Sequence, residues 1–130
     1  MVNSHPSSII SPKAKIGDNV TIGPYCVIND DVKIENNVKL KAHVYLDGNT
    51  TIGDNCIFFP YCSIGTIPQD LKYKGEKSNL VIGSNNIFRE YVTVNPGTEG
   101  GGLITSIGNN CLFMISSHIA HDCIIGNNVV

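Results

Sequence analysis

Charged residues are scarce in this chain of 130 residues, where Asp, Glu, Lys and Arg together make up 15%. The Lys and Arg residues form no basic cluster and the formal net charge is −2, which argues against nucleic acid as a partner. No apolar run is long enough to predict a membrane span, and the segment 1–10 lacks the basic-then-apolar pattern of a secretory signal. No Cys-x-x-Cys pair occurs, which excludes a zinc ribbon.

A six-residue repeat is the main feature that the sequence does contain. Large apolar residues recur at every sixth position: Ile10, Ile16, Ile22, Ile28, Ile34, Leu40, Leu46, Ile52, Phe58 and Ile64. Small or β-branched residues form a second series, four positions after the first: Ala14, Val20, Cys26, Val32, Val38, Val44, Thr50, Cys56 and Cys62. A period of six fits neither an α-helix nor a hairpin, and is typical of a parallel β-helix in which three hexads make one triangular coil. We therefore expect an all-β solenoid with both series facing inward.

Asn-containing dipeptides are spaced as the corners of such coils require. They are Asp18-Asn19, Asn36-Asn37, Asp54-Asn55, Asn85-Asn86, Asn109-Asn110 and Asn127-Asn128. Asn, Asp and Gly adopt positive φ at the lowest cost, so we expect the chain to turn at these positions. The five cysteines, Cys26, Cys56, Cys62, Cys111 and Cys123, all fall at small inward positions. They are odd in number and spaced by the repeat, which predicts a reduced, cytoplasmic core and no disulfide framework.

The repeat is interrupted twice. After Ile64 the next two hexad positions would be Asp70 and Glu76, which cannot face an apolar core unpaired, so we expect a projecting loop near residues 66–80. Such a polar loop on a rigid scaffold is a common place for binding residues. A second phase slip coincides with the glycine-rich segment 97–102, which is no phosphate loop because no helix signal and no Lys-Ser/Thr pair follow it.

We expect residues 1–130 to form a single β-helix domain with an imperfect or frayed first coil. The sequence ends inside a hexad that begins at Ile125, and no cap is visible there. Solenoids usually carry a cap, so we expect the chain to be truncated at its C-terminal end.

Two histidines close to each other are the best candidates for chemistry. His118 and His121 flank Ile119, which occupies a large inward position. An extended strand would point His121 inward, whereas a corner would turn it outward, and the spacing alone does not decide between these. On spacing alone, two ordinary surface histidines near a corner are the favoured interpretation.

Three segments resemble the UDP-N-acetylglucosamine O-acyltransferase family of hexapeptide-repeat acyltransferases. They are Met114-Ile115-Ser116-Ser117-His118-Ile119-Ala120-His121-Asp122-Cys123, Gln69-Asp70-Leu71-Lys72-Tyr73-Lys74-Gly75-Glu76 and Gly100-Gly101-Gly102-Leu103. The resemblance implies a left-handed parallel β-helix and a homotrimer. It also implies transfer of an (R)-3-hydroxyacyl chain from acyl carrier protein to the 3-hydroxyl of UDP-GlcNAc, the first step of lipid A biosynthesis, with no cofactor.

The same resemblance implies roles for seven residues. His121 matches the general base, a role that suits histidine because it titrates near neutral pH. Asp122 would orient His121. The implied substrate-binding residues are Gln69, Asp70, Lys72, His118 and Met114, and the loop of one chain would face the histidines of a neighbouring chain. No metal site is implied.

Three alternatives stay open. The chain could be a truncated trimeric module that binds or has a structural role without turnover. A γ-type carbonic anhydrase needs three zinc-binding histidines, but His118 and His121 are closer together than that family's pair. The N-acyltransferase of the same pathway or a CoA-dependent acetyltransferase would share the scaffold, although the loop and the segment 118–122 argue against both.

Overall fold

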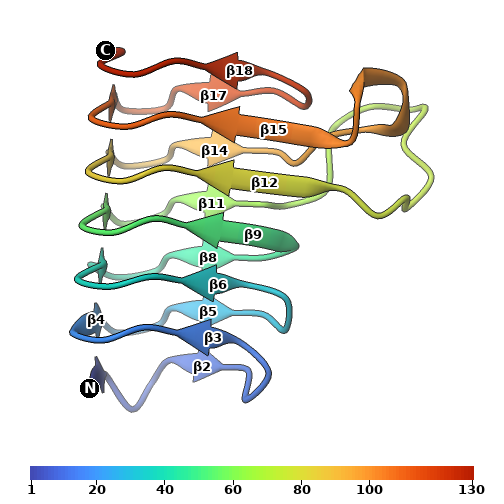
Figure 1. The fold of residues 1–130 in the computed structure, drawn as a ribbon. Helices are drawn as coiled ribbons and strands as arrows, with labels where there is room; N and C mark the ends of the chain where they lie inside the picture. Colours follow the sequence, from blue (N-terminus) through green and yellow to red (C-terminus); the bar gives the residue numbers. More distant parts are fainter.

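The computed structural model describes all residues from 1 to 130 and is built from three parallel six-stranded sheets (Figure 1). The first sheet contains β1 (Val2–Ser4), β4 (Val20–Ile22), β7 (Lys39–Leu40), β10 (Ile57–Phe58), β13 (Ile87–Phe88) and β16 (Leu112–Phe113). The second contains β2 (Ile9–Ile10), β5 (Val27–Ile28), β8 (Tyr45–Leu46), β11 (Ser63–Ile64), β14 (Thr93–Val94) and β17 (His118–Ile119). The third contains β3 (Lys15–Ile16), β6 (Lys33–Ile34), β9 (Asn49–Ile52), β12 (Asn79–Ile82), β15 (Ile104–Ile107) and β18 (Ile124–Ile125).

Successive strands along the chain belong to different sheets, so the chain visits the three walls in turn and rises one coil per circuit. This is the parallel β-helix that the hexads predicted, with the left-handed coil that the family resemblance implied, and Figure 1 shows the coils stacked from the N-terminus to the C-terminus. The first coil forms too, because β1 pairs with β4 and β2 with β5. The only helix is a single 3₁₀ turn, η1 (Glu99–Gly101), so no helix is long and apolar enough to span a bilayer.

Parallel register places equivalent hexad positions directly above one another, which produces continuous columns of buried side chains. Leu40 pairs with Phe58, Phe58 with Phe88, and Phe88 with Phe113. The rings of Phe58 and Phe88 stack at 4.6 Å, and those of Phe88 and Phe113 at 4.8 Å. Burying each such side chain stabilises the fold by about 1.5–3 kcal/mol. The predicted inward series therefore forms the core, except that Ile10, Ala14 and Ile16 in the first coil are only partly buried.

The cysteines occupy the inward positions that the repeat predicted. Cys26, Cys56, Cys62 and Cys111 are buried, Cys123 is half-buried, and all five are free thiols. Burial raises the pKa of the Cys56 and Cys62 thiols to about 11, which leaves them protonated at neutral pH. They act as small apolar core residues.

The corner between the third and the first sheet is formed as predicted by the Asn-containing dipeptides. One residue of each pair has positive φ: Asn19, Asn37, Asn55, Asn85, Asn110 and Asn128. Their amides also pair between coils, for example from Asn19 Nδ2 to Asn37 Oδ1 at 2.7 Å. The side chains thus bond one coil to the next as well as permitting the turn.

The corner between the first and the second sheet was not predicted, because aromatic residues replace Asn and Gly there. Tyr25, His43, Tyr61 and Tyr91 all adopt positive φ, between 52° and 71°. Their rings form an exposed ladder with centroids 5.0–5.1 Å apart. A left-handed conformation destabilises an ordinary residue by about 1–2 kcal/mol, and each stacked pair of rings stabilises the fold by about 0.5–1.5 kcal/mol. Stacking between coils therefore offsets much of the local strain.

The corner between the second and the third sheet holds both interruptions of the repeat. Register pairs Ile64 with Val94 and Ile82 with Ile107, so each extra segment is an insertion at the corner and no coil is lost. The first loop is shorter than 66–80, because Asn79 and Leu80 already belong to β12 and Leu80 is fully buried. The two loops project side by side from the stack (Figure 1).

Candidate functional site

The two loops at this corner enclose a polar pocket of about 690 Å³. We call residues 65–78 the first loop and residues 95–103 the second loop. The lining comprises Asp70, Leu71, Lys72, Lys74, Glu76, Thr98, Glu99, Gly100, Gly101, His121 and Asp122. The first loop contributes the first five residues, the second loop the next four, and the coil above them supplies the histidine and its neighbour. Leu71 is the only large apolar side chain among them, so the pocket suits a polar ligand.

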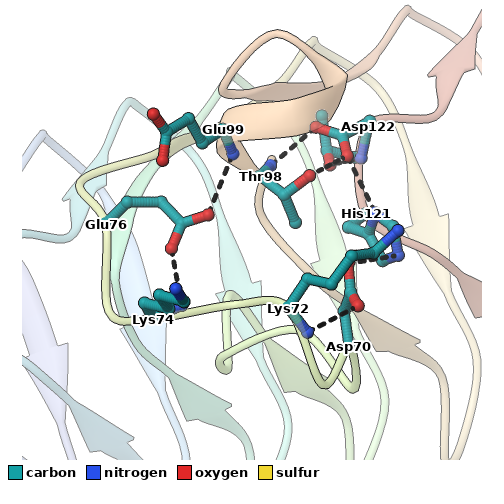
Figure 2. A network of polar contacts seen from close by, with 9 residues as sticks. Asp70, Lys72, Lys74, Glu76, Thr98, Glu99, His121 and Asp122 are labelled. Carbon is teal, nitrogen blue, oxygen red and sulfur yellow. Dashed lines mark hydrogen bonds and ion pairs between the residues drawn. The ribbon is translucent and has the colours of Figure 1, made fainter.

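His121 points out of the prism into this pocket. Ile119 occupies the inward position, and Asp122 turns the corner with a φ of 65°, which settles the orientation that the spacing left open. The side chain of His121 is 34% exposed. Nδ1 lies 2.8 Å from Asp122 Oδ2, and Nε2 lies 3.7 Å from Asp70 Oδ2 (Figure 2). The imidazole is thus held between two carboxylates, hydrogen-bonded to one of them and open toward the other.

Asp122 is held in place by the second loop. Its Oδ1 accepts the backbone N–H of Thr98 at 2.6 Å, and its Oδ2 accepts the Thr98 hydroxyl at 2.5 Å (Figure 2). The backbone N–H of Asp122 donates to Thr105 Oγ1 at 2.9 Å. Burial alone would raise the pKa of this carboxyl, but the hydrogen bonds from Thr98 and His121 outweigh it and lower the pKa. Asp122 is therefore a carboxylate at neutral pH, and accepts the Nδ1–H of His121.

The first loop is ordered by its own acidic residues. Asp70 Oδ1 accepts the backbone N–H of Lys72 at 3.0 Å, and Glu76 Oε1 accepts that of Lys74 at 2.8 Å. Glu76 Oε2 also accepts the backbone N–H of Glu99 at 2.9 Å, which ties the two loops together (Figure 2). These backbone donors lower the pKa of Glu76. The ammonium groups of Lys72 and Lys74 pair with no carboxylate and are free to meet an anionic ligand.

The structure thus brings together Asp70, Lys72, His121 and Asp122 of the seven candidate residues. The contact between Asp70 and His121 occurs within one chain, and the expectation that a loop of one chain also faces the histidines of another stays a prediction. A second chain is not required to bring these two groups together.

Gln69 and His118 lie beside the main pocket and line a smaller one of about 450 Å³, together with Thr66, Thr93 and Asn95. His118 Nδ1 is hydrogen-bonded to Thr93 Oγ1 at 2.7 Å.

Met114 precedes β17, whereas His121 follows it, so the two residues lie at opposite ends of that strand. Met114 is 61% exposed and lines neither pocket. The structure gives Met114 no contact with the other candidates.

Sequence reasoning missed Thr98, Glu76 and Gly101 as parts of the site. The signal for Thr98 lies in the register, because Val94 pairs with Ile119 and position 98 therefore falls one coil below the turn at Asp122. This pairing of β14 with β17 follows only once the second insertion is known to lie at a corner. No group of three or more His, Cys, Asp or Glu side chains is arranged to hold a metal ion.

Comparison with known proteins decides the family. The model of the bacterial transferase hexapeptide (six repeats) family matches residues 13–48, 31–66 and 104–130, together more than half of the chain. This chain belongs to the bacterial transferase hexapeptide family. The matched hexapeptide segments include the coil that carries His121 and exclude most of the first loop, in keeping with insertions on a regular scaffold.

Individual relatives of this family member carry more specific names. An acyl-[acyl-carrier-protein]--UDP-N-acetylglucosamine O-acyltransferase of Rickettsia bellii is 59% identical over 121 residues, which are 93% of this chain and 43% of the relative. The enzyme of the same name from Thermodesulfovibrio yellowstonii is 51% identical over 97% of this chain and 49% of its own length. A solved UDP-N-acetylglucosamine acyltransferase from Campylobacter jejuni superimposes with a TM-score of 0.91 at 44% identity, over 99% of this chain and 50% of that one. The chain spans about half the length of the proteins it matches.

Proposed function

We propose that this chain carries the histidine-bearing part of an acyltransferase that moves an (R)-3-hydroxyacyl group from acyl carrier protein to the 3-hydroxyl of UDP-GlcNAc. The observation that supports it most directly is His121, hydrogen-bonded to an ionised Asp122 and open at Nε2 toward a polar pocket. The likeness to relatives bearing that name over more than nine-tenths of the chain points to the same reaction.

In the proposed reaction His121 is the general base. Asp122 accepts the Nδ1–H, so the lone pair of Nε2 faces the pocket and takes the proton of the sugar hydroxyl. The hydroxyl oxygen forms a bond to the thioester carbonyl carbon, and the carbon–sulfur bond breaks. The proton held on Nε2 then passes to the departing thiolate, which leaves as the free thiol of the carrier. Atoms and charge balance without a metal or cofactor.

The pocket also supplies groups for holding the sugar nucleotide. The ammonium groups of Lys72 and Lys74 would meet the negative charge of a nucleoside diphosphate, and Asp70 would accept hydrogen bonds from sugar hydroxyls beside His121. Gln69 and His118 would extend the site into the adjacent smaller pocket. Met114 would reach substrate only from its separate corner, so its role carries the least structural support. We propose that the protein acts as a homotrimer in the cytoplasm, where five free thiols stay reduced.

The test is acyl transfer by the purified protein, followed by mass spectrometry of acylated UDP-GlcNAc. We expect product with the wild type and about a 10²–10⁴-fold loss in His121→Ala, the range expected for removing a general base. The matched control is His5→Ala, because His5 lies in the first coil and contacts only Ser7 through its side chain. Product formation at wild-type rate by the His121→Ala protein would refute the assignment.

A second candidate is a binding module without turnover. It is favoured by one observation: Lys72, Asp70 and His121 line one pocket within a chain that spans about half the length of its relatives. Calorimetry with UDP-GlcNAc separates the two. Binding that depends on Lys72 but yields no acylated product supports the module, and binding with product supports the enzyme.

A further inference from the structure

The second loop has no role in the proposed function so far, yet it makes the closest contacts to the carboxylate behind His121. Asp122 has two carboxylate oxygens, and Thr98 donates to both of them, once through its backbone N–H and once through its hydroxyl. His121 Nδ1 donates to Oδ2 as well, so that this oxygen accepts two hydrogen bonds. Thr98 is itself only 5% exposed, so these donors are shielded from water.

We propose that Thr98 is a positioning residue for the reaction, the third member of a Thr98–Asp122–His121 chain that fixes which imidazole nitrogen carries the proton. The proposal rests on the proposed function, in which His121 is the base. Thr98 borders the pocket but is nearly buried, and it acts on the reaction through its two hydrogen bonds to Asp122. The two donors fix the carboxylate plane, so Oδ2 stays aimed at Nδ1 and the histidine proton stays on that nitrogen.

Backbone hydrogen bonds fix the position of Thr98 beside Asp122. Its carbonyl oxygen accepts the N–H groups of Gly101 at 3.2 Å and Leu103 at 2.8 Å, which closes the tight turn around η1. Gly102 turns the chain with a φ of 106°, a value that favours glycine. A methyl group added at Gly101 would overlap the Asp122 carboxylate. The glycines let the turn close directly over Asp122, which explains why this segment is glycine-rich.

The same turn is connected to the first loop. Glu76 accepts the N–H of Glu99, the residue after Thr98, and its other oxygen accepts the N–H of Lys74. The substrate loop and the segment that orients Asp122 therefore share one hydrogen-bonded bridge. Glu76→Gln keeps one acceptor oxygen and turns an NH₂ group toward the other backbone donor, which breaks one end of the bridge. We therefore expect it to raise KM and lower kcat together, whereas a change at Thr98 acts on kcat.

The experiment compares Thr98→Val, Thr98→Ser and Thr50→Val. Thr98→Val removes the hydroxyl donor and leaves the backbone donor, so we expect kcat to fall about 10–100-fold, the effect of losing one hydrogen bond to a charged group, with KM nearly unchanged. Thr98→Ser keeps the hydroxyl and should stay within about threefold of wild type by the same reasoning. Thr50→Val is the matched control, because Thr50 is fully buried in β9 beside the same corner of a lower coil and its hydroxyl donates to the Asp47 carbonyl at 2.7 Å.

Nitrogen-15 NMR of the histidine ring gives a readout that does not depend on turnover. The wild type, Thr98→Ser and Thr50→Val should show His121 with its proton on Nδ1, and Thr98→Val should show a mixture of the two tautomers. Loss of activity in Thr98→Val with an unchanged His121 tautomer would overturn the proposal, as would an equal loss in Thr50→Val. A wild type that shows the Nδ1–H signal dependent on Thr98 but forms no product would refute the proposed function and leave the positioning role standing.

Discussion

Asp122→Asn is the most informative single substitution, because the hydrogen bonds around this residue dictate how an amide must sit. In the wild type Oδ1 accepts the Thr98 N–H at 2.6 Å, while Oδ2 accepts both the Thr98 hydroxyl and His121 Nδ1–H. An Asn side chain has only one oxygen to replace these two acceptors. One of the two sites must therefore receive an NH₂ group that faces a donor.

The two orientations of the amide differ in cost. Placing NH₂ against the Thr98 backbone N–H leaves a buried donor unsatisfied, which costs about 1–3 kcal/mol. Placing NH₂ at the Oδ2 site lets the Thr98 hydroxyl rotate, and His121 accepts at Nδ1 once its proton moves to Nε2. The second orientation has the lower free energy. It leaves His121 with its proton on Nε2, the nitrogen that must act as the base.

We therefore expect Asp122→Asn to lower kcat by about 10³–10⁴-fold with little change in folding, since an Asp-to-Asn change that imposes the wrong histidine tautomer costs about 10⁴ in serine proteases. The assay is initial-rate acyl transfer, with thermal unfolding to confirm the fold. Asp70→Asn is the control, because Asp70 Oδ2 lies 3.7 Å from Nε2 and does not set the tautomer, so its loss should appear mainly in KM. An Asp122→Asn protein within about tenfold of the wild-type kcat would refute this reasoning.

Three further predictions concern stability. Phe88→Ala should cost about 3–5 kcal/mol in urea denaturation, because Phe88 is fully buried and stacks on both Phe58 and Phe113; a cost under about 1 kcal/mol would contradict the columnar packing. Tyr61→Asn should cost only about 1 kcal/mol, because relief of its positive φ offsets part of the two lost stacked pairs; a cost near that of Phe88→Ala would show the ladder to be stronger than stacking alone allows. The pKa of Asp122 is lowered on folding, so its contribution is complete above the ordinary value of 3.8 and is lost as the pH falls through the lowered pKa. The difference in unfolding free energy between wild type and Asp122→Asn should therefore be constant near neutral pH and shrink below 3.8, and an unchanged difference in acid would contradict the lowered pKa.

The sequence by itself determined the solenoid, its inward residues and one of its corners. These features are local: each hexad buries its own large residue, and Asn at positions such as Asn37 tolerates the left-handed turn without outside help. The existence of a polar loop carrying Asp70 followed from the same rule, since a carboxylate cannot occupy an inward position unpaired. The histidine segment stood out for its residue types and for its resemblance to one family.

Tertiary structure alone decided which groups meet. Tyr61 adopts a positive φ because rings one coil above and below stack on it, and no local preference of tyrosine indicates that. The Asp70–His121 and Thr98–Asp122 contacts join residues 51 and 24 positions apart, and they arise only because both insertions leave the same corner one coil from each other. A repeat specifies which way each side chain faces, whereas the distance between two loops depends on how many residues lie between the coils that carry them.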